Sequence, residues 1–224
     1  MRFAISLFIF MFLTSACPAG ADELSDLRTK AKSGDAVAQY DLGTFYEKKQ
    51  GKGKRKIKND KQAVSWYTKA ADQGLASAQF DLGRMYVAGK GVTRDSELGV
   101  SWQLKAAEQG LASAQFVIGK RYFSGAGMPQ DYELALDLFL LAAEQGFTSA
   151  QNQLAVMHFK GEGVPKDLVQ AHKWFSIASA SDDPSAKRLR PVLEEIMEQE
   201  QIEEAQRLAS EWATGHQVDQ ETSD

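Results

Sequence analysis

Apolar residues recur along most of this chain with a helical period. One wide stripe comprises Ala63, Trp66, Tyr67, Ala70 and Ala71, at spacings i, i+3, i+4, i+7 and i+8. A narrower stripe places Ala78, Leu82 and Tyr86 four residues apart on one helix face. No segment shows the strict alternation of a half-buried strand, so the pattern predicts an all-α fold.

The two kinds of stripe alternate in a repeat. The segment AQYDLG that begins at Ala38 returns at Ala78 (AQFDLG), at Ala114 (AQFVIG) and more loosely at Ala150 (AQNQLA). The segment WYTKAADQG of residues 66–74 matches residues 102–110, and 138–146 and 174–178 continue it. The first unit is longer than the others by four residues, since its offset is 40 and the later offsets are 36. The spacing predicts four units, each of two helices.

Glycine and aspartate punctuate each predicted unit. A Gly-x-Gly element follows each of the last three first helices, and an Asp follows it, suited to cap the second helix: Gly89–Gly91 with Asp95, Gly125–Gly127 with Asp131, and Gly161–Gly163 with Asp167. Gly74, Gly110 and Gly146 come just past the second helices. These residues predict tight turns within and between the units.

One helix pair cannot bury its apolar face by itself, so neighbouring units are expected to stack into a solenoid, with Trp66, Trp102 and Trp174 buried between helices. Helical stretches outside the repeats are expected to cap both ends, and the polar end of the chain is expected to be disordered. The predicted divisions are a signal peptide (1–21), an N-terminal capping helix (22–34), repeats 1 to 4 (35–74, 75–110, 111–146 and 147–180), C-terminal capping helices (181–212) and a disordered tail (213–224).

The repeated unit resembles the Sel-one-like repeat, a relative of the tetratricopeptide repeat. The similarity lies in Ala-Gln-Phe-x-Leu-Gly-x-x-Tyr, then Gly-x-Gly-Val-x-x-Asp, then Ala-x-x-Trp-x-x-Lys-Ala-Ala-x-Gln-Gly, and it covers roughly residues 35–180. Gly99 in place of Ala and Ala155 in place of Gly are small departures. The resemblance implies a right-handed αα superhelical solenoid and a function as a scaffold or adaptor for other proteins.

The first residues have the features of a secretory signal peptide. Arg2 precedes an apolar run from Phe3 to Leu13, and small residues follow up to Ala21. This run of eleven residues, apolar except for Ser6, falls short of the roughly 20 that span a bilayer. Cleavage after Ala21 predicts a periplasmic or secreted protein without a thiol. The alternative is a lipoprotein anchored at Cys17, the one cysteine of the sequence, behind a poor lipoprotein signal.

Charge singles out one segment. The net charge is −4 over 224 residues, too small for the whole molecule to favour a polyanionic partner. Lys48 to Lys61 nevertheless contains eight cations and lies in the longer loop of the first unit. It could contact anionic lipid or an acidic protein, and this loop is the one expected place of membrane contact. It could also be a solvated loop that balances the acidic C-terminal helices.

The sequence offers little to catalysis. His158, His172 and His216 form no metal-binding pattern, and no nucleophile elbow, phosphate-binding loop or catalytic cysteine is present. The Gly-x-Gly elements and the aspartates recur once a repeat, as turns and caps do. We therefore expect no enzyme activity, no cofactor, no metal and no nucleic-acid partner, and we expect a monomer.

Positions that differ between repeats are candidates for a binding site, because stacking does not require a particular residue there. If first helices line the concave face, as in tetratricopeptide-like solenoids, three positions in each unit face it: Tyr40, Phe80, Phe116 and Asn152; Thr44, Arg84, Lys120 and Val156; Glu47, Val87, Phe123 and Phe159. The predicted partner-binding residues are Tyr40, Phe80, Arg84, Phe116, Lys120 and Phe123. Aromatic side chains around two cations suit a peptide or a partner protein with an acidic group. The aromatic residues could equally be core, and the two cations could be plain solvated charges.

Two functions remain open at this stage. The first is an exported protein–protein interaction scaffold, in envelope regulation or signalling. The second is a cell-wall-related ligand binder or a β-lactamase-like hydrolase, which rests on cysteine-rich relatives whose disulfides this chain lacks.

Overall fold

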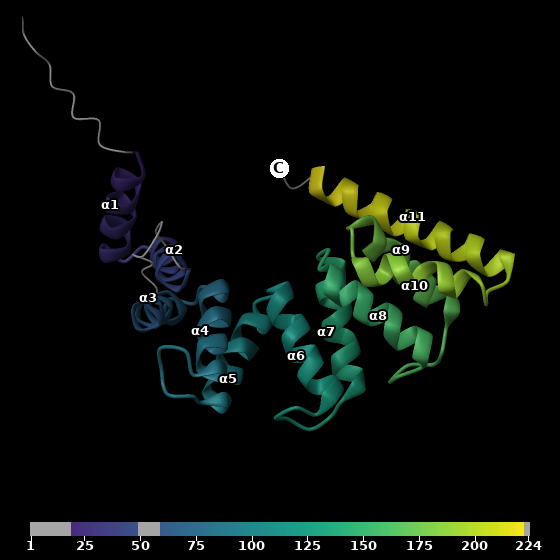
Figure 1. The fold of residues 1–224 in the computed structure, drawn as a ribbon, viewed down its shortest axis with the longest axis horizontal. Helices are drawn as coiled ribbons and strands as arrows, with labels where there is room; N and C mark the ends of the chain where they lie inside the picture. The colour runs from purple at the N-terminus through teal and green to yellow at the C-terminus, as the bar shows by residue number, and fades with distance from the viewer. Residues whose placement is uncertain (1–18, 49–58, 222–224) are drawn as a thin grey trace, which may run out of the picture.

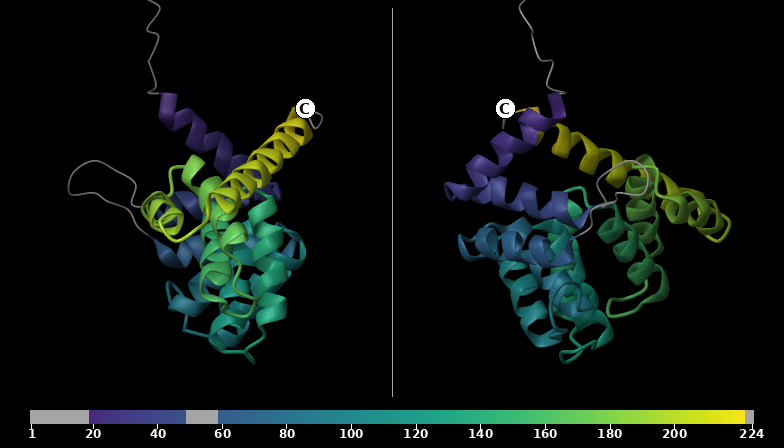
Figure 2. Two further views of the ribbon diagram at one scale, coloured as in Figure 1. Left: turned by 90° about the vertical axis from the view of Figure 1, so that its right-hand side faces the viewer. Right: turned by 60° about the vertical axis from the view of Figure 1, so that its left-hand side comes forward.

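The computed structural model describes residues 19–48 and 59–221, and the regular elements of these residues are all α-helices. Successive helices pack side by side along a curved array, with α1 and α11 at its two ends (Figures 1 and 2). The predicted solenoid of four helix pairs with capping helices is confirmed. The helices are α1 Ala19–Lys32, α2 Ala36–Glu47, α3 Asp60–Asp72, α4 Ala76–Ala88, α5 Ser96–Glu108, α6 Ala112–Ser124, α7 Tyr132–Glu144, α8 Thr148–Lys160, α9 Leu168–Ala180, α10 Pro184–Glu194 and α11 Gln199–Glu221.

The helices begin and end where the capping aspartates and the turn glycines predict. The carboxylates of Asp95, Asp131 and Asp167 accept hydrogen bonds from backbone N–H groups in the first turns of α5, α7 and α9. Each of α4, α6 and α8 ends at a glycine in the left-handed conformation, such as Gly89 with φ 65°. Local sequence therefore fixes the length of each helix before any packing is considered.

The most buried large side chain of the second helices lies one residue after the position of the tryptophans. Trp174 is 2% exposed, but Trp66 and Trp102 are only partly buried, each with a lysine ammonium over its ring. The prediction that all three are buried is thus wrong for Trp66 and Trp102, and Trp174 differs because α11 packs on α9 and covers it. The buried position is that of Tyr67, Phe139 and Phe175, each no more than 1% exposed.

The second unit departs from this arrangement. Gln103 takes the core position and is 4% exposed, and its Oε1 has no hydrogen-bond partner among the described residues. A Cβ atom added to Gly83 would lie 2.5 Å from the carbonyl oxygen of Gly99. The backbones of α4 and α5 therefore touch, an approach that only paired glycines allow.

Buried glutamines link each unit to its neighbour. Gln79 of α4 donates to the carbonyl oxygen of Ala71 (3.2 Å), and its Oε1 accepts from Gln109 Nε2 (2.7 Å). Parts of the same pattern recur as Gln39 with Ala31 and Gln73, Gln115 with Gln145, and Gln151 with Ala143. The bonds satisfy amides that stacking buries, at the same place in each unit.

This ladder of amides ends at the fourth unit. Ser181 stands 36 residues after Gln145, where the next donor glutamine would lie. Gln151 Oε1 is accordingly buried without a hydrogen-bond partner among the described residues. The sequence itself marks the place where the regular array stops.

Two helices close the C-terminal end. Both α10 and α11 pack on α9, and α11 runs back across it, as Figure 1 shows. The sequence predicts a disordered tail over 213–224, but in the structure α11 continues to Glu221. The reason lies in Trp212 and His216, whose rings stack at 3.8 Å and whose side-chain nitrogens both reach Glu144 of α7.

At the N-terminus, α1 packs on α2 and begins at Ala19, ahead of Asp22, the predicted first residue of the mature chain. Residues 1–18, which carry most of the predicted signal peptide and Cys17, lie outside the described residues. Among the helices that are described, none has the length and apolar character to cross a membrane.

Candidate partner-binding site

The predicted face is organised around Arg84 on α4. Its Nη2 lies 2.5 Å from Glu47 Oε2 on α2, and its Nε lies 3.1 Å from Asp81 Oδ1. The Tyr40 hydroxyl donates to Asp81 Oδ2 (3.1 Å), and the Tyr67 hydroxyl donates to Glu47 Oε2 (3.0 Å). The first two units are thereby joined by one polar network, which we call the Arg84 network: Tyr40, Glu47, Tyr67, Asp81 and Arg84.

The charged groups of the network shift one another's pKa. Burial by itself would raise the pKa of Glu47, but the hydrogen bond and charge of Arg84 outweigh it and hold the pKa below its ordinary value. Burial would lower the pKa of Arg84, and the bonds and charges of Glu47 and Asp81 reverse this and raise it. Burial also raises the pKa of the phenols of Tyr40 and Tyr67, so both remain hydrogen-bond donors at neutral pH. Arg84 is therefore paired within the chain.

Lys120 differs from Arg84, although it occupies the same position one repeat later. Its side chain is exposed, and among the side chains that the structure describes, those of residues 24–48 and 59–216, no carboxylate lies within ion-pair distance of its ammonium group. The ammonium lies 5.7 Å from the centre of the Phe116 ring. Lys120 also lines a shallow hollow of about 270 Å³ on α6 with Val117 and Arg121. It is thus the cation of the predicted pair that can accept an outside carboxylate.

The predicted aromatic residues are partly core. Phe116 packs against Phe139 and Phe147, with ring centres 5.7 and 5.3 Å apart. Phe123 contacts Phe139 and Tyr132, and Phe80 packs on the core cluster between the second and third units. All three are of intermediate burial, so they stabilise the stack and remain partly accessible to solvent.

The basic loop at Lys48 to Lys61 lies largely outside the described residues, since 49–58 are not described. At its two ends, Lys48 and Lys61 are exposed.

One row of polar groups, around His172, has no recognisable pattern in the sequence. His172 is fully buried, with Nε2 2.9 Å from Glu194 Oε1 and Nδ1 3.3 Å from the hydroxyl of Ser176. Serine, histidine and carboxylate in this order resemble a hydrolase triad. Ser176 lies inside α9, however, where the helix uses the backbone N–H groups that an oxyanion would need. The row fits the packing of α10 on α9, and of the described residues no His, Cys, Asp and Glu gather as a metal site.

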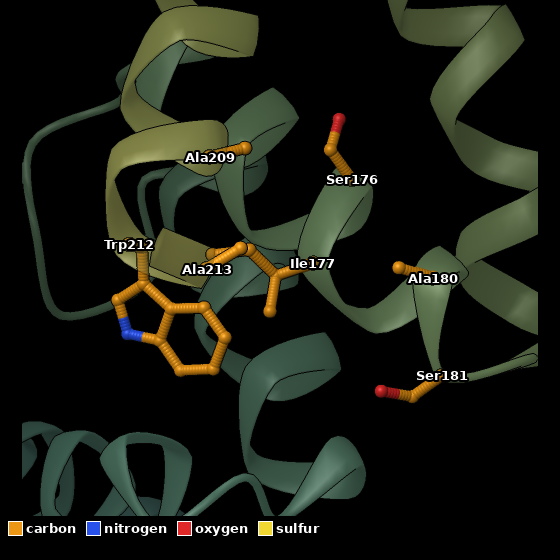
Figure 3. A pocket seen from close by; sticks show the side chains of 7 residues that line it. All are labelled: Ser176, Ile177, Ala180, Ser181, Ala209, Trp212 and Ala213. Carbon is orange, nitrogen blue, oxygen red and sulfur yellow. The ribbon is translucent and has the colours of Figure 1, made fainter. Parts of the chain in front are cut away.

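A small hollow separates α9 from α11. It measures about 250 Å³ and is mostly apolar, with side chains of α9 facing those of α11 across it (Figure 3). The Trp212 indole forms one wall, and Ile177 lies across from it. Ser181, which ends the amide ladder, lies at its edge. The hollow shows how a helix packs on the second helix of a unit.

Comparison with known proteins agrees with the fold. The sequence model of the Sel1 repeat family matches residues 36–75, 76–111, 112–147 and 148–183. A protective antigen of uropathogenic Escherichia coli strains that displays an SLR fold is similar over 86% of this chain, with 34% identity and a TM-score of 0.75. A Sel1 repeat protein from Oxalobacter formigenes is similar over 77% of it, with 32% identity and a TM-score of 0.70. The matched parts amount to 40% and 49% of those two chains. Among curated protein sequences, none matches this chain.

Proposed function

Because the chain belongs to the Sel1 repeat family, whose members are generally scaffolds for protein–protein interaction, we propose that it binds an acidic peptide segment of a partner protein. The proposed site is the concave face of the solenoid, around Tyr40, Phe80, Arg84, Phe116, Lys120 and Phe123. The scaffold acts in the periplasm or outside the cell, after cleavage behind Ala21, in envelope regulation or signalling.

The observation that supports this site best is the exposed ammonium group of Lys120, which has no ion-pair partner among the described side chains and lies 5.7 Å from the centre of the Phe116 ring. Repeats 1 and 4 place Thr44 and Val156 at the equivalent position, so stacking does not require a cation there. A carboxylate of the partner can pair with the ammonium, while Phe116 and Phe123 contact apolar atoms beside it. A charge-assisted hydrogen bond of this kind contributes about 1.5–3 kcal/mol.

Arg84 has a different part in the proposed site. Its guanidinium already pairs with Glu47 and Asp81, so a partner carboxylate would have to displace one of them. The Arg84 network instead fixes the angle between the first two units and so sets the shape of the face that the partner meets. Removing Arg84 would leave two carboxylates without their cation, which makes Arg84→Ala a change in stability as well as in binding.

The experiment compares partner capture by the full chain and by two lysine variants. Lys120→Thr copies the residue of repeat 1, and Lys30→Thr removes an exposed lysine of α1 as the matched control. Photo-cross-linking in envelope extract, with quantitative mass spectrometry, is expected to show a partner whose yield falls at least tenfold in Lys120→Thr. The yield with Lys30→Thr should equal that of the native chain. Equal yields for all three proteins, with unchanged circular dichroism, would show that Lys120 has no part in binding.

A further inference from the structure

A second surface lies on the other side of α6 from the proposed site. At 100° per residue, Ile118 and Tyr122 face away from Phe116 and Lys120. They form the floor of a hollow of about 400 Å³ between α5 and α7. We call this hollow the α5–α7 groove.

The wall that α7 contributes is a row of leucines. Leu134, Leu138 and Leu141 line the groove, and Leu134 and Leu141 are 43% and 53% exposed. Leu104 of α5 lines the opposite side. Large apolar side chains with such exposure leave a contiguous apolar surface in contact with water.

Stacking does not account for these leucines. At the positions of Leu138 and Leu141, repeat 1 has Trp66 and Lys69, whose ammonium lies 4.3 Å from the centre of the indole. Repeat 2 has the same pair, at 4.2 Å. Units 1 and 2 thus cover this place with their own cation, and unit 3 replaces the cation with an exposed leucine.

Unit 4 shows what covers the same surface when the lysine is missing. Ile177 stands 36 residues after Leu141, and it is only 6% exposed because α11 packs on α9. The ring of Trp212 packs against Trp174, and its Nε1 donates to Glu144 Oε2 (3.1 Å). In unit 4 this surface is therefore covered by a helix of the same chain, α11.

The acidic group that receives α11 is also repeated. Glu108 stands 36 residues before Glu144 and lines the α5–α7 groove. Leu138 and Leu141 correspond to Trp174 and Ile177 in the same way. The groove is the counterpart of the α11 seat one unit earlier, and it adjoins that seat through α7, which carries both Leu141 and Glu144.

The charges at the rim determine which helix fits. In the α11 seat Glu144 is accompanied by Lys173: burial lowers the pKa of Lys173, and the negative charge of Glu144 opposes this shift. The groove has Asp137 at the position of Lys173, so Glu108 and Asp137 make its rim purely acidic. Residues 199–216 carry four glutamates and one arginine, and the acidic rim of the groove would repel the glutamates as charges of the same sign. An occupant of the groove has to bring cations.

From this geometry we propose that the α5–α7 groove binds an amphipathic helix of a partner protein. The helix sets large apolar side chains against Leu134, Leu138 and Leu141, as Trp212 sits against Trp174. It points Lys or Arg at Glu108 and Asp137. The surface is separate from the one around Lys120, so the two proposals stand or fall independently.

The probe is a synthetic peptide with the sequence of residues 199–216 in which the four glutamates are replaced by lysine. It keeps the apolar face that seats on α9 and reverses the charge of the flanks. The native-sequence peptide is the control. Titration of the full chain, followed by fluorescence anisotropy, is expected to give a Kd at least tenfold lower for the lysine peptide.

Two variants of the chain locate the binding. Leu141→Lys and Asp137→Ser each introduce the residue that repeats 1 and 2 already have at that position, so neither disturbs stacking. Each should weaken binding of the lysine peptide at least fivefold, whereas Lys120→Thr should leave it unchanged. A photoreactive group at the Trp212 position of the peptide should label α5 or α7.

Absence of saturable binding, equal affinity of the two peptides, or unchanged affinity in Leu141→Lys would overturn the proposal. Self-association of the chain that Leu141→Lys abolishes would also overturn it, because the occupant would then be a second copy. A partner that Lys120→Thr releases and Leu141→Lys retains would leave the proposed function intact and count against the groove alone.

Discussion

Glu144, the last residue of α7, accepts a hydrogen bond from the indole N–H of Trp212 on α11, 68 residues further along the chain. His216 Nε2 lies 2.9 Å from the same carboxylate oxygen. One carboxylate therefore holds the end of the terminal helix against a unit that is not its sequence neighbour.

Trp212→Ala should destabilise the chain by about 2–4 kcal/mol, because it removes both the contact with Trp174 and the bond to Glu144. Trp212→Phe keeps a ring against Trp174 and should cost less than half as much. Chemical denaturation measures both, and hydrogen exchange should show faster exchange in 199–216 for the alanine variant. Equal protection of these amides in the native chain and Trp212→Ala would contradict the role of this contact.

The tryptophans of the repeats should differ in importance. Trp174→Ala creates a cavity beneath α11 and should lower the free energy of unfolding by about 3–5 kcal/mol. Trp102 is partly exposed, so Trp102→Ala should lower it by about 1–2 kcal/mol. Both values come from urea denaturation followed by circular dichroism. A larger loss for Trp102→Ala than for Trp174→Ala would mean that burial in the folded state does not rank these positions.

Gly83→Ala should destabilise the second unit by more than about 2 kcal/mol, because the added methyl group would meet the Gly99 carbonyl and the backbone cannot yield. Gly215→Ala is the matched control, since its methyl group would meet nothing within 4 Å. In that exposed helical position the change should stabilise α11 by about 0.5–1 kcal/mol. Thermal melting should give a lower Tm for Gly83→Ala and a higher Tm for Gly215→Ala. A change of Tm in the same direction for both variants would contradict this.

Acid should weaken the Arg84 network. A carboxyl group whose pKa is lower in the folded state stabilises that state above its unfolded pKa, and the contribution is lost as the pH falls through the folded pKa. The pKa of Glu47 is lowered from 4.5. Glu47→Gln should therefore cost about 1–2 kcal/mol at pH 7, and the difference from the native chain should shrink as the pH falls below 4.5.

The measurement is the free energy of unfolding of both proteins between pH 7 and pH 3. Asp26→Asn, at an exposed residue of α1, is the control and should show no such convergence. A difference that stays constant with pH would show that Glu47 and Arg84 do not interact as described.

Export should remove Met1 to Ala21. Mass spectrometry of the exported protein is expected to give an N-terminus at Asp22. A lipid-modified Cys17, or an intact Met1, would contradict the predicted processing.

Sequence pattern was enough for the helices, because their determinants are local. The spacing of Ala63, Tyr67 and Ala71 shows the buried face, and Asp95 marks a helix start within three residues of the N–H that it caps. The apolar stripe does not show which of Trp66 and Tyr67 is buried, since both lie on it. Their burial depends on which neighbouring helix packs over each side chain. That helix comes from another part of the chain.

The site was harder to predict for the same reason. Arg84 was expected to be free, but its partner Glu47 lies 37 residues away, and their distance depends on how α2 packs against α4. The groove leucines do leave a signal in the sequence: repeats 1 and 2 have Lys69 and Lys105 at the position where repeat 3 has Leu141.

The amide ladder has a consequence for how such a chain can change in length. Gln79, Gln115 and Gln151 are spaced by 36 residues, and so are their donors Gln109 and Gln145. Duplication or loss of one 36-residue unit within the array would join ends that carry the same amides, and every junction would keep its bonds. The number of units can therefore vary through the duplication or loss of a single segment, without any change to the residues that join one unit to the next.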